Sequence, residues 1–306
     1  MKQPIPRICL LLAAVWGIAS CSPNPYAATN KSYKKQAKAY ARTLRTAPLV
    51  TPGADSLLMG DTWVGTTNFN LRKPNFVIIH HTEQHSTEQT LKTFTLPRTQ
   101  VSAHYVIGRD GKVYHMLNDY LRAWHGGLGK WGNNTDINSS SLGIELDNNG
   151  AEPFAEAQIN SLLKLLAILK KTHSIPTANF IGHADIAPTR KVDPNPTFPW
   201  QKLAQHGFGF WYDAEVLENV PVADSTAIPA QAALPDSTIT QDIMAQASAL
   251  PAYFNFTEAL RIIGYDIKNI DAAIRAFKLH FIQKEVNTTL TESDKRVLYN
   301  LYQKYL

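Results

Sequence analysis

The stretch SLGIELDNNG occupies residues 141–150 and predicts a buried strand with one charged exception. Aliphatic residues occupy alternate positions, so Leu142, Ile144 and Leu146 share one face of the strand. Glu145 then lies on the opposite face. A carboxylate between aliphatic neighbours either pairs with a buried arginine or serves a functional site. This strand therefore supplies part of the core and one candidate functional residue.

The flanking segments predict strands and helices in a mixed order. Short apolar runs and a GRDG turn at residues 108–111 predict strands, and apolar residues at helical spacing predict helices. The predicted strands are 76–79, 103–107, 112–117, 141–148 and 179–182, and the predicted helices are 86–96 and 153–173. This order predicts the α/β class, with a mixed central β-sheet flanked by helices.

Histidine and acidic residues lie at the ends of these elements. His80 ends the first strand, His183 follows the strand at 179–182, and Asp193 lies further along the same proline-rich loop. Imidazole and carboxylate are zinc ligands, and a catalytic zinc site keeps one position open for the attacking water. Glu145 can take the proton of that water, and Lys191 can stabilise the oxyanion. The inventory indicates a hydrolase with one zinc ion.

Two choices stay open from the residues alone. His80 and His81 are adjacent on a strand, so their side chains point to opposite faces and only one of them serves the site. Asp185 shares a segment with His183 and competes with Asp193 as the carboxylate ligand.

Five short segments follow one another in an order that resembles a known family. They read VIIHHTE (77–83), VSAHYVIGRDGKVYHML (101–117), AWHGG (123–127), SLGIELDNNG (141–150) and GHADIAPTRKVDPNPTFPW (182–200). Together they resemble the zinc-dependent N-acetylmuramoyl-L-alanine amidases of type 2, and in particular the outer-membrane lipoproteins among them.

The resemblance implies a fold, a reaction and a role for each residue. The fold would be the mixed sheet shared by type 2 amidases and peptidoglycan-recognition proteins. The reaction would be hydrolysis of the amide bond between N-acetylmuramic acid and L-alanine by zinc-activated water. The roles implied are metal ligands for His80, His183 and Asp193, general acid–base for Glu145, oxyanion stabilisation for Lys191, and substrate binding for His104, Trp124 and His125.

The N-terminus predicts export and a lipid anchor. The apolar run ICLLLAAVWGIA follows two basic residues and is too short to span a bilayer, which suits a signal peptide over residues 1–20. The sequence IASC at residues 18–21 resembles a lipobox, in which Cys21 becomes lipidated. The other cysteine, Cys9, lies in the segment that would be removed, so no disulfide is expected. We expect a lipoprotein of the outer membrane that faces the periplasm.

A basic run follows the predicted anchor. Residues 31–45 hold six lysines and arginines and no acid. We interpret residues 21–70 as a solvated tether and a leading arm; the alternative is a surface-lying helix with an apolar face of Tyr33, Ala37, Tyr40 and Leu44. The net charge of +5 is mild, and no recognisable nucleic-acid-binding motif accompanies the run. Nucleic acid is therefore not an expected partner.

The C-terminal part predicts a linker and a second domain. Residues 218–250 are rich in alanine, threonine and proline, which is typical of a linker. Residues 251–306 predict three helices, and they resemble the small peptidoglycan-binding domains appended to wall hydrolases. All catalytic candidates lie in residues 71–217, so we expect that part to fold and act alone as a monomer.

Two other functions stay open. A peptidoglycan-recognition module without catalysis would keep the groove but lack metal ligands, whereas here every ligand position and Glu145 are filled. A zinc carboxypeptidase acting within the stem peptide would differ only in the bond that it cuts. The sequence holds no His-Glu-x-x-His or Gly-x-Ser-x-Gly motif, so thermolysin-like and serine hydrolases have no support.

Overall fold

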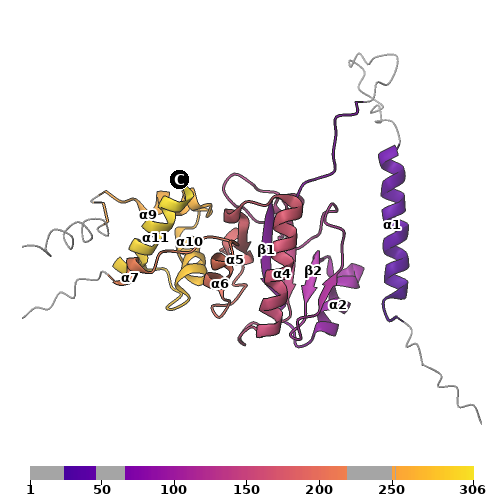
Figure 1. The fold of residues 1–306 in the computed structure, drawn as a ribbon, viewed down its shortest axis with the longest axis horizontal. Coiled ribbons are helices and arrows are strands. Elements are labelled where there is room, and N and C mark those ends of the chain that lie inside the picture. Colours follow the sequence, from indigo (N-terminus) through magenta and orange to yellow (C-terminus); the bar gives the residue numbers. More distant parts are fainter. Residues whose placement is uncertain (1–23, 46–65, 219–249, 252) are drawn as a thin grey trace, which may run out of the picture. The chain divides into compact units, whose positions relative to one another are not determined.

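The computed structural model describes residues 24–45, 66–218, 250–251 and 253–306. These residues belong to two compact units, which divide between Asn68 and Phe69. Among the described residues, the first unit holds helix α1 (Ala27–Arg45), and the second holds the sheet and the other helices (Figure 1). The predicted signal peptide, Cys21 and nearly all of the predicted linker lie outside the described residues.

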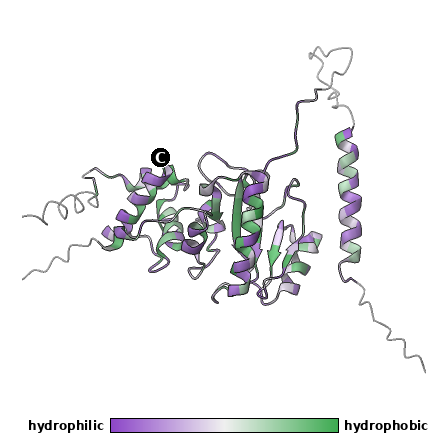
Figure 2. Ribbon diagram, in the orientation of Figure 1, coloured by the Kyte–Doolittle hydropathy of each residue, from purple (hydrophilic) through white to green (hydrophobic). Residues whose placement is uncertain are grey.

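Helix α1 shows that the basic run is helical, while its role as a solvated tether or a surface-lying helix stays a prediction. Residues Ala27–Arg45 form a helix with no buried residue, and it is mostly hydrophilic (Figure 2). The physical reason is composition, because alanine, lysine, glutamine and arginine favour helices and no glycine or proline interrupts the segment. No helix in the described part of the chain has the length and apolar character needed to cross a membrane.

The second unit is built on a mixed sheet of five strands, as the sequence predicts. Its order is β3-β2-β4-β1-β5. Neighbouring strands are parallel except β2 and β3, which form the predicted hairpin. The strands are β1 (Phe76–His81), β2 (Tyr105–Ile107), β3 (Val113–His115), β4 (Ser141–Leu146) and β5 (Phe180–Gly182).

The two faces of the sheet have different partners. The aliphatic face of β4 (Leu142, Ile144, Leu146) lies in a core that includes leucines of the long helix α4 (Glu156–His173). In Figure 1 this helix runs alongside β1. On β1, Ile78 belongs to a second core on the opposite face. Strand alternation puts His80 and Glu145 on that same opposite face, next to each other in register. The sheet therefore separates a packed side from the side that carries the polar candidates.

Shorter helices connect these strands. Helix α2 confirms the predicted helix after the first strand, and α4 confirms the long packing helix. The segment after β5 differs from the prediction, because His183 begins a short helix and does not lie in a loop. The shorter elements are α2 (Thr87–Thr95), η1 (Pro97–Thr99), α3 (Ile137–Ser140), η2 (Thr177–Asn179), α5 (His183–Ile186), α6 (Trp200–Gln205) and α7 (Glu215–Glu218).

The C-terminal residues form the predicted group of helices, namely α9 (Phe256–Ile263), α10 (Ile270–Phe277) with its continuation η3 (Lys278–Ile282), and α11 (Glu292–Tyr305). Their apolar side chains share one buried core with residues of the sheet domain. That core includes Ile78 of β1, Ile181 of β5 and Ile186 of α5 together with Leu260, Phe277 and Leu298. The C-terminal helices thus pack directly on the elements that carry the polar candidates.

Candidate active site

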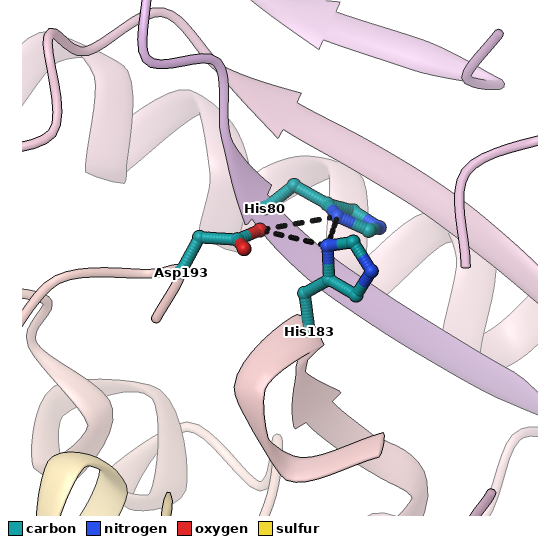
Figure 3. A group of neighbouring side chains, drawn as sticks. All are labelled: His80, His183 and Asp193. Atoms are coloured by element: carbon teal, nitrogen blue, oxygen red, sulfur yellow. Dashed lines mark hydrogen bonds and ion pairs between the residues drawn. The ribbon is translucent and has the colours of Figure 1, made fainter. Parts of the chain in front are cut away.

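Three buried side chains from distant parts of the chain point toward one another (Figure 3). The Nδ1 atom of His80 lies 2.9 Å from Nδ1 of His183 and 3.3 Å from Oδ2 of Asp193. The distance from His183 Nδ1 to the same carboxylate oxygen is 3.0 Å. Each residue is at most 6% exposed, and together they form a group able to hold a metal ion. These are the three residues that the family resemblance implies as metal ligands.

The backbone around α5 links two of these residues. Gly182 ends β5, and its N–H donates to the Asp185 carboxylate in the first turn of α5. The N–H of Ala184 donates to the backbone carbonyl of Asp193 at 2.8 Å. The same short turn therefore carries His183 and holds the backbone of Asp193 in place.

The charge states suit a metal ion. Burial and the neighbouring His183 lower the pKa of His80 to about 4, so its ring is neutral at neutral pH with a lone pair available. Burial opposes ionisation of Asp193, but hydrogen bonds from His183 and His80 outweigh it and hold its pKa well below the usual range. Two imidazole nitrogens and one carboxylate oxygen are a donor set typical of catalytic zinc. The residues fit such an ion.

Glu145 is buried beside the donor set. It pairs in register with His80 across β4 and β1, and its Oε1 lies 4.0 Å from His80 Nδ1. Burial raises its pKa to about 8, the negative charge of Asp193 adds to this, and the positive charge of Lys191 acts in the opposite direction. A carboxyl group that titrates near neutral pH suits proton transfer in both directions.

Lys191 lies close enough to the carboxyl group of Glu145 to lower its pKa electrostatically. Its side chain is half-buried, and its ammonium group makes no hydrogen bond or ion pair with the described parts of the chain. Its backbone N–H donates to Ala187, which extends the turn after α5. Lys191 therefore offers a positive charge near both His80 and Glu145.

The structure separates the competing residues that the sequence left open. His81 points to the other side of β1, where its Nδ1 accepts a hydrogen bond from the backbone of Asn195. The carboxylate of Asp185 is also outside the donor set, because it faces Gly182, Tyr265 and His280.

Of the three residues expected to line the substrate groove, His104 does not reach the surface. It is fully buried, its Nδ1 accepts from the backbone N–H of Gly143, and its Nε2 faces the Arg72 guanidinium and the carbonyl of Leu121. The physical reason is its position at the edge of β2, where its own N–H continues the pairing with Gly143 of β4. His104 therefore supports the sheet, and its contact with substrate stays a prediction.

His125 and Trp124 differ in exposure. The His125 ring is buried, with Nδ1 3.0 Å from Nε2 of His80 and Nε2 3.1 Å from the Ser141 hydroxyl. His125 thus contacts Nε2 of His80, whereas Nδ1 of His80 faces the other two residues of the donor set. Trp124 is 53% exposed and can reach a ligand at the surface.

Gly143 explains how His125 comes so close to the sheet. A Cβ on Gly143 would lie 2.4 Å from Cγ of His125, so no other residue leaves room for the ring. The glycine in SLGIEL was the signal in the sequence for this contact. Arg72, which faces His104, lies before all of the motifs and had no such signal.

Comparison with known proteins identifies the family of this chain. A family model described as N-acetylmuramoyl-L-alanine amidase (Amidase_2) matches residues 70–196. The amidase AmiD of Escherichia coli K12 is 30% identical over 251 residues, which is 75% of this chain and 82% of that protein. The chain belongs to the N-acetylmuramoyl-L-alanine amidase family. The 1,6-anhydro-N-acetylmuramyl-L-alanine amidase AmpD of Haemophilus influenzae is 36% identical over 104 residues, or 34% of this chain and 56% of that protein.

Solved structures confirm the fold. The complex of E. coli AmiD with anhydro-N-acetylmuramic acid-L-Ala-D-gamma-Glu-L-Lys has a TM-score of 0.61 at 29% identity, and the match covers 80% of this chain and 94% of that one. AMPDH3 of Pseudomonas aeruginosa has a TM-score of 0.62 at 24% identity, covering 81% and 98%. Both matches extend beyond the length of the sheet domain alone.

Proposed function

We propose that this protein hydrolyses the amide bond between N-acetylmuramic acid and L-alanine in peptidoglycan fragments, with one zinc ion. The observation that carries the proposal is the buried group of His80, His183 and Asp193 in a chain of the amidase family. The E. coli relative was solved with an anhydromuramyl tripeptide as its substrate. We extend that substrate class to this chain.

The residues of the site divide the work of amide hydrolysis. A zinc ion supplies a Lewis acid that polarises the carbonyl and acidifies water when it is bound. Glu145 accepts a proton from the attacking water and then delivers it to the departing amino group of L-alanine. The ammonium group of Lys191 stabilises the negative charge that develops on the carbonyl oxygen.

The products decide between this reaction and its alternatives. Mass spectrometry after incubation with anhydro-N-acetylmuramic acid-L-Ala-D-γ-Glu-L-Lys should find free anhydro-N-acetylmuramic acid and the intact tripeptide. A carboxypeptidase would leave L-alanine attached to the sugar acid. A recognition module would bind the compound and release nothing. Either of these results would contradict the proposal.

We also propose that the mature protein is anchored by a lipid on Cys21 to the periplasmic side of the outer membrane. The support is the signal-like N-terminus and the small residues before Cys21. Cell fractionation tests this location. The wild-type protein should be found with the outer membrane and a Cys21→Ser variant should not; a wild-type protein in the soluble fraction would contradict the anchor.

A further inference from the structure

Asp185 is a buried carboxylate outside the donor set, and the C-terminal helices supply most of its partners. It lies on α5, two residues after His183, and is 1% exposed. Its Oδ1 accepts from the Tyr265 hydroxyl at 2.8 Å, and its Oδ2 lies 2.7 Å from Nδ1 of His280. Oδ2 also accepts from the backbone N–H of Gly182 at 2.7 Å. A buried carboxylate needs such donors, since an unpaired one is costly.

Both donors from the C-terminal part are themselves held by aromatic contacts. Tyr265 follows α9, is 2% exposed, and packs edge-on against Trp131 of the sheet domain. Burial and the charge of Asp185 raise the pKa of Tyr265 well above its ordinary value, so its hydroxyl stays a donor. The His280 ring stacks on Trp200 of α6 with 3.9 Å between ring centroids. Neither donor can turn away without breaking this packing.

The contacts of Asp185 lead directly to the metal-facing residues. Its hydrogen bond from Gly182 closes the first turn of α5, and this turn begins with His183. The next residue of the turn, Ala184, donates to the backbone of Asp193. A shift of this turn would therefore move two of the three donor side chains.

We propose that the C-terminal helices position the metal ligands, because Tyr265 and His280 hold Asp185 and Asp185 fixes the turn that carries His183. The proposal rests on the metal site of the proposed function. It departs from our expectation that residues 71–217 act alone, because the C-terminal helices also share a core with β1 and β5. Their predicted affinity for peptidoglycan is a separate property and stays a prediction.

The experiment uses the full chain and measures metal binding directly. Tyr265→Phe and His280→Phe each remove one donor but keep an aromatic ring for packing, and Asp185→Asn removes the charge that both donors meet. Competition with a chelator gives the dissociation constant for Zn²⁺, and visible absorption of the Co²⁺-loaded protein reports the ligand geometry. We expect about a tenfold weaker Zn²⁺ affinity in each variant, the lower end of the effect of residues that orient metal ligands, and an altered Co²⁺ spectrum.

Asp294→Asn is the matched control. Asp294 is a buried aspartate of α11 that pairs with Lys278 and accepts from the backbone of Thr291. The control weakens the same helical unit without touching Asp185, and thermal unfolding of the metal-free protein measures how much. We expect its Zn²⁺ affinity and Co²⁺ spectrum to equal those of the wild type.

Two outcomes would overturn the proposal. One is wild-type Zn²⁺ affinity in the Asp185, Tyr265 and His280 variants. The other is a loss of Zn²⁺ affinity in Asp294→Asn as large as that in the three variants, when its loss of thermal stability is also as large as theirs. That result would mean that general destabilisation is the cause. If Asp185→Asn does not fold, Tyr265→Phe still tests the proposal, because it removes only one hydroxyl group. Zn²⁺ affinity needs no substrate, so failure of the wild type to cleave muramyl peptides would count against the proposed function alone.

Discussion

Glu145 lies directly across from His80 on the neighbouring parallel strand, with 4.0 Å between Oε1 and Nδ1. The pairing of β4 with β1 brings the acid beside the donor set, and both residues are buried. A residue on a central strand is held more rigidly than one on a loop. The geometry therefore favours a catalytic role for Glu145, and its substitution tests that role.

Glu145→Gln should bind zinc like the wild type but have a much lower kcat. The amide preserves size and hydrogen bonding but cannot accept the proton, so kcat should fall by roughly two to four orders of magnitude. Metal analysis and steady-state kinetics measure both properties. Glu156→Gln, a change of an exposed acid at the start of α4, is the control. A rate for Glu145→Gln equal to that of the control would reduce Glu145 to a structural acid.

The stability of the metal-free protein should depend on pH through Glu145. Burial raises its pKa from 4.5 to about 8, so the fold favours the protonated form. This contribution is fully present below about pH 4.5 and is lost as the pH rises through about 8. Relative to Glu145→Gln, the wild type should thus lose unfolding free energy on the order of a few kcal/mol over this range.

Denaturant unfolding of both proteins at a series of pH values measures this difference. Adding Zn²⁺ is the control, because a nearby cation favours the carboxylate and should reduce the pH dependence. Parallel stability curves for the metal-free wild type and Glu145→Gln would show that burial does not shift this group.

The zinc content of two variants, Asp193→Ala and Asp185→Asn, should distinguish a metal ligand from a residue that positions one. Asp193 supplies an oxygen to the donor set, whereas Asp185 acts through the turn of α5. We expect Asp193→Ala to lose zinc at stoichiometric concentration, and Asp185→Asn to keep it there despite its weaker affinity. Metal content after gel filtration distinguishes them. Zinc retained by Asp193→Ala and lost by Asp185→Asn would mean that the carboxylate ligand is wrongly chosen.

Lys191→Met should lower kcat about 10²- to 10³-fold, the usual effect of removing one group that stabilises an oxyanion. Zinc content should stay unchanged, since the ammonium group is not a ligand. Lys191→Arg keeps the charge and should recover part of the rate. Lys171→Met, at an exposed lysine of α4, controls for the loss of a positive charge. Equal kcat in both methionine variants would remove Lys191 from the mechanism.

The sheet and the direction of Glu145 could be predicted because strand alternation is a local property. The apolar positions of β4 predict which side chains share a face, and the structure confirms this. The same rule says that His80 and His81 point apart but not which of them faces the site. That choice depends on which face the helices cover, and it came from the family resemblance.

Other features had no local signal. Helix α5 is four residues long, too short for a periodic pattern, so His183 was expected in a loop. His104 was expected at the substrate, but a pairing with β4 buries it. The contacts of Asp185 with Tyr265 and His280 join residues 80 and 95 positions apart. Pairings at this separation appear only once the chain is folded.

The most direct test of the central claim is the rate of tripeptide release from anhydro-N-acetylmuramic acid-L-Ala-D-γ-Glu-L-Lys, followed by mass spectrometry while Zn²⁺ is added to the metal-free protein. We predict no release without metal, because the three donors place the ion that activates water. Release should rise and level off at one Zn²⁺ per chain. Full activity in the metal-free protein, or cleavage at another bond when zinc is present, would contradict the account.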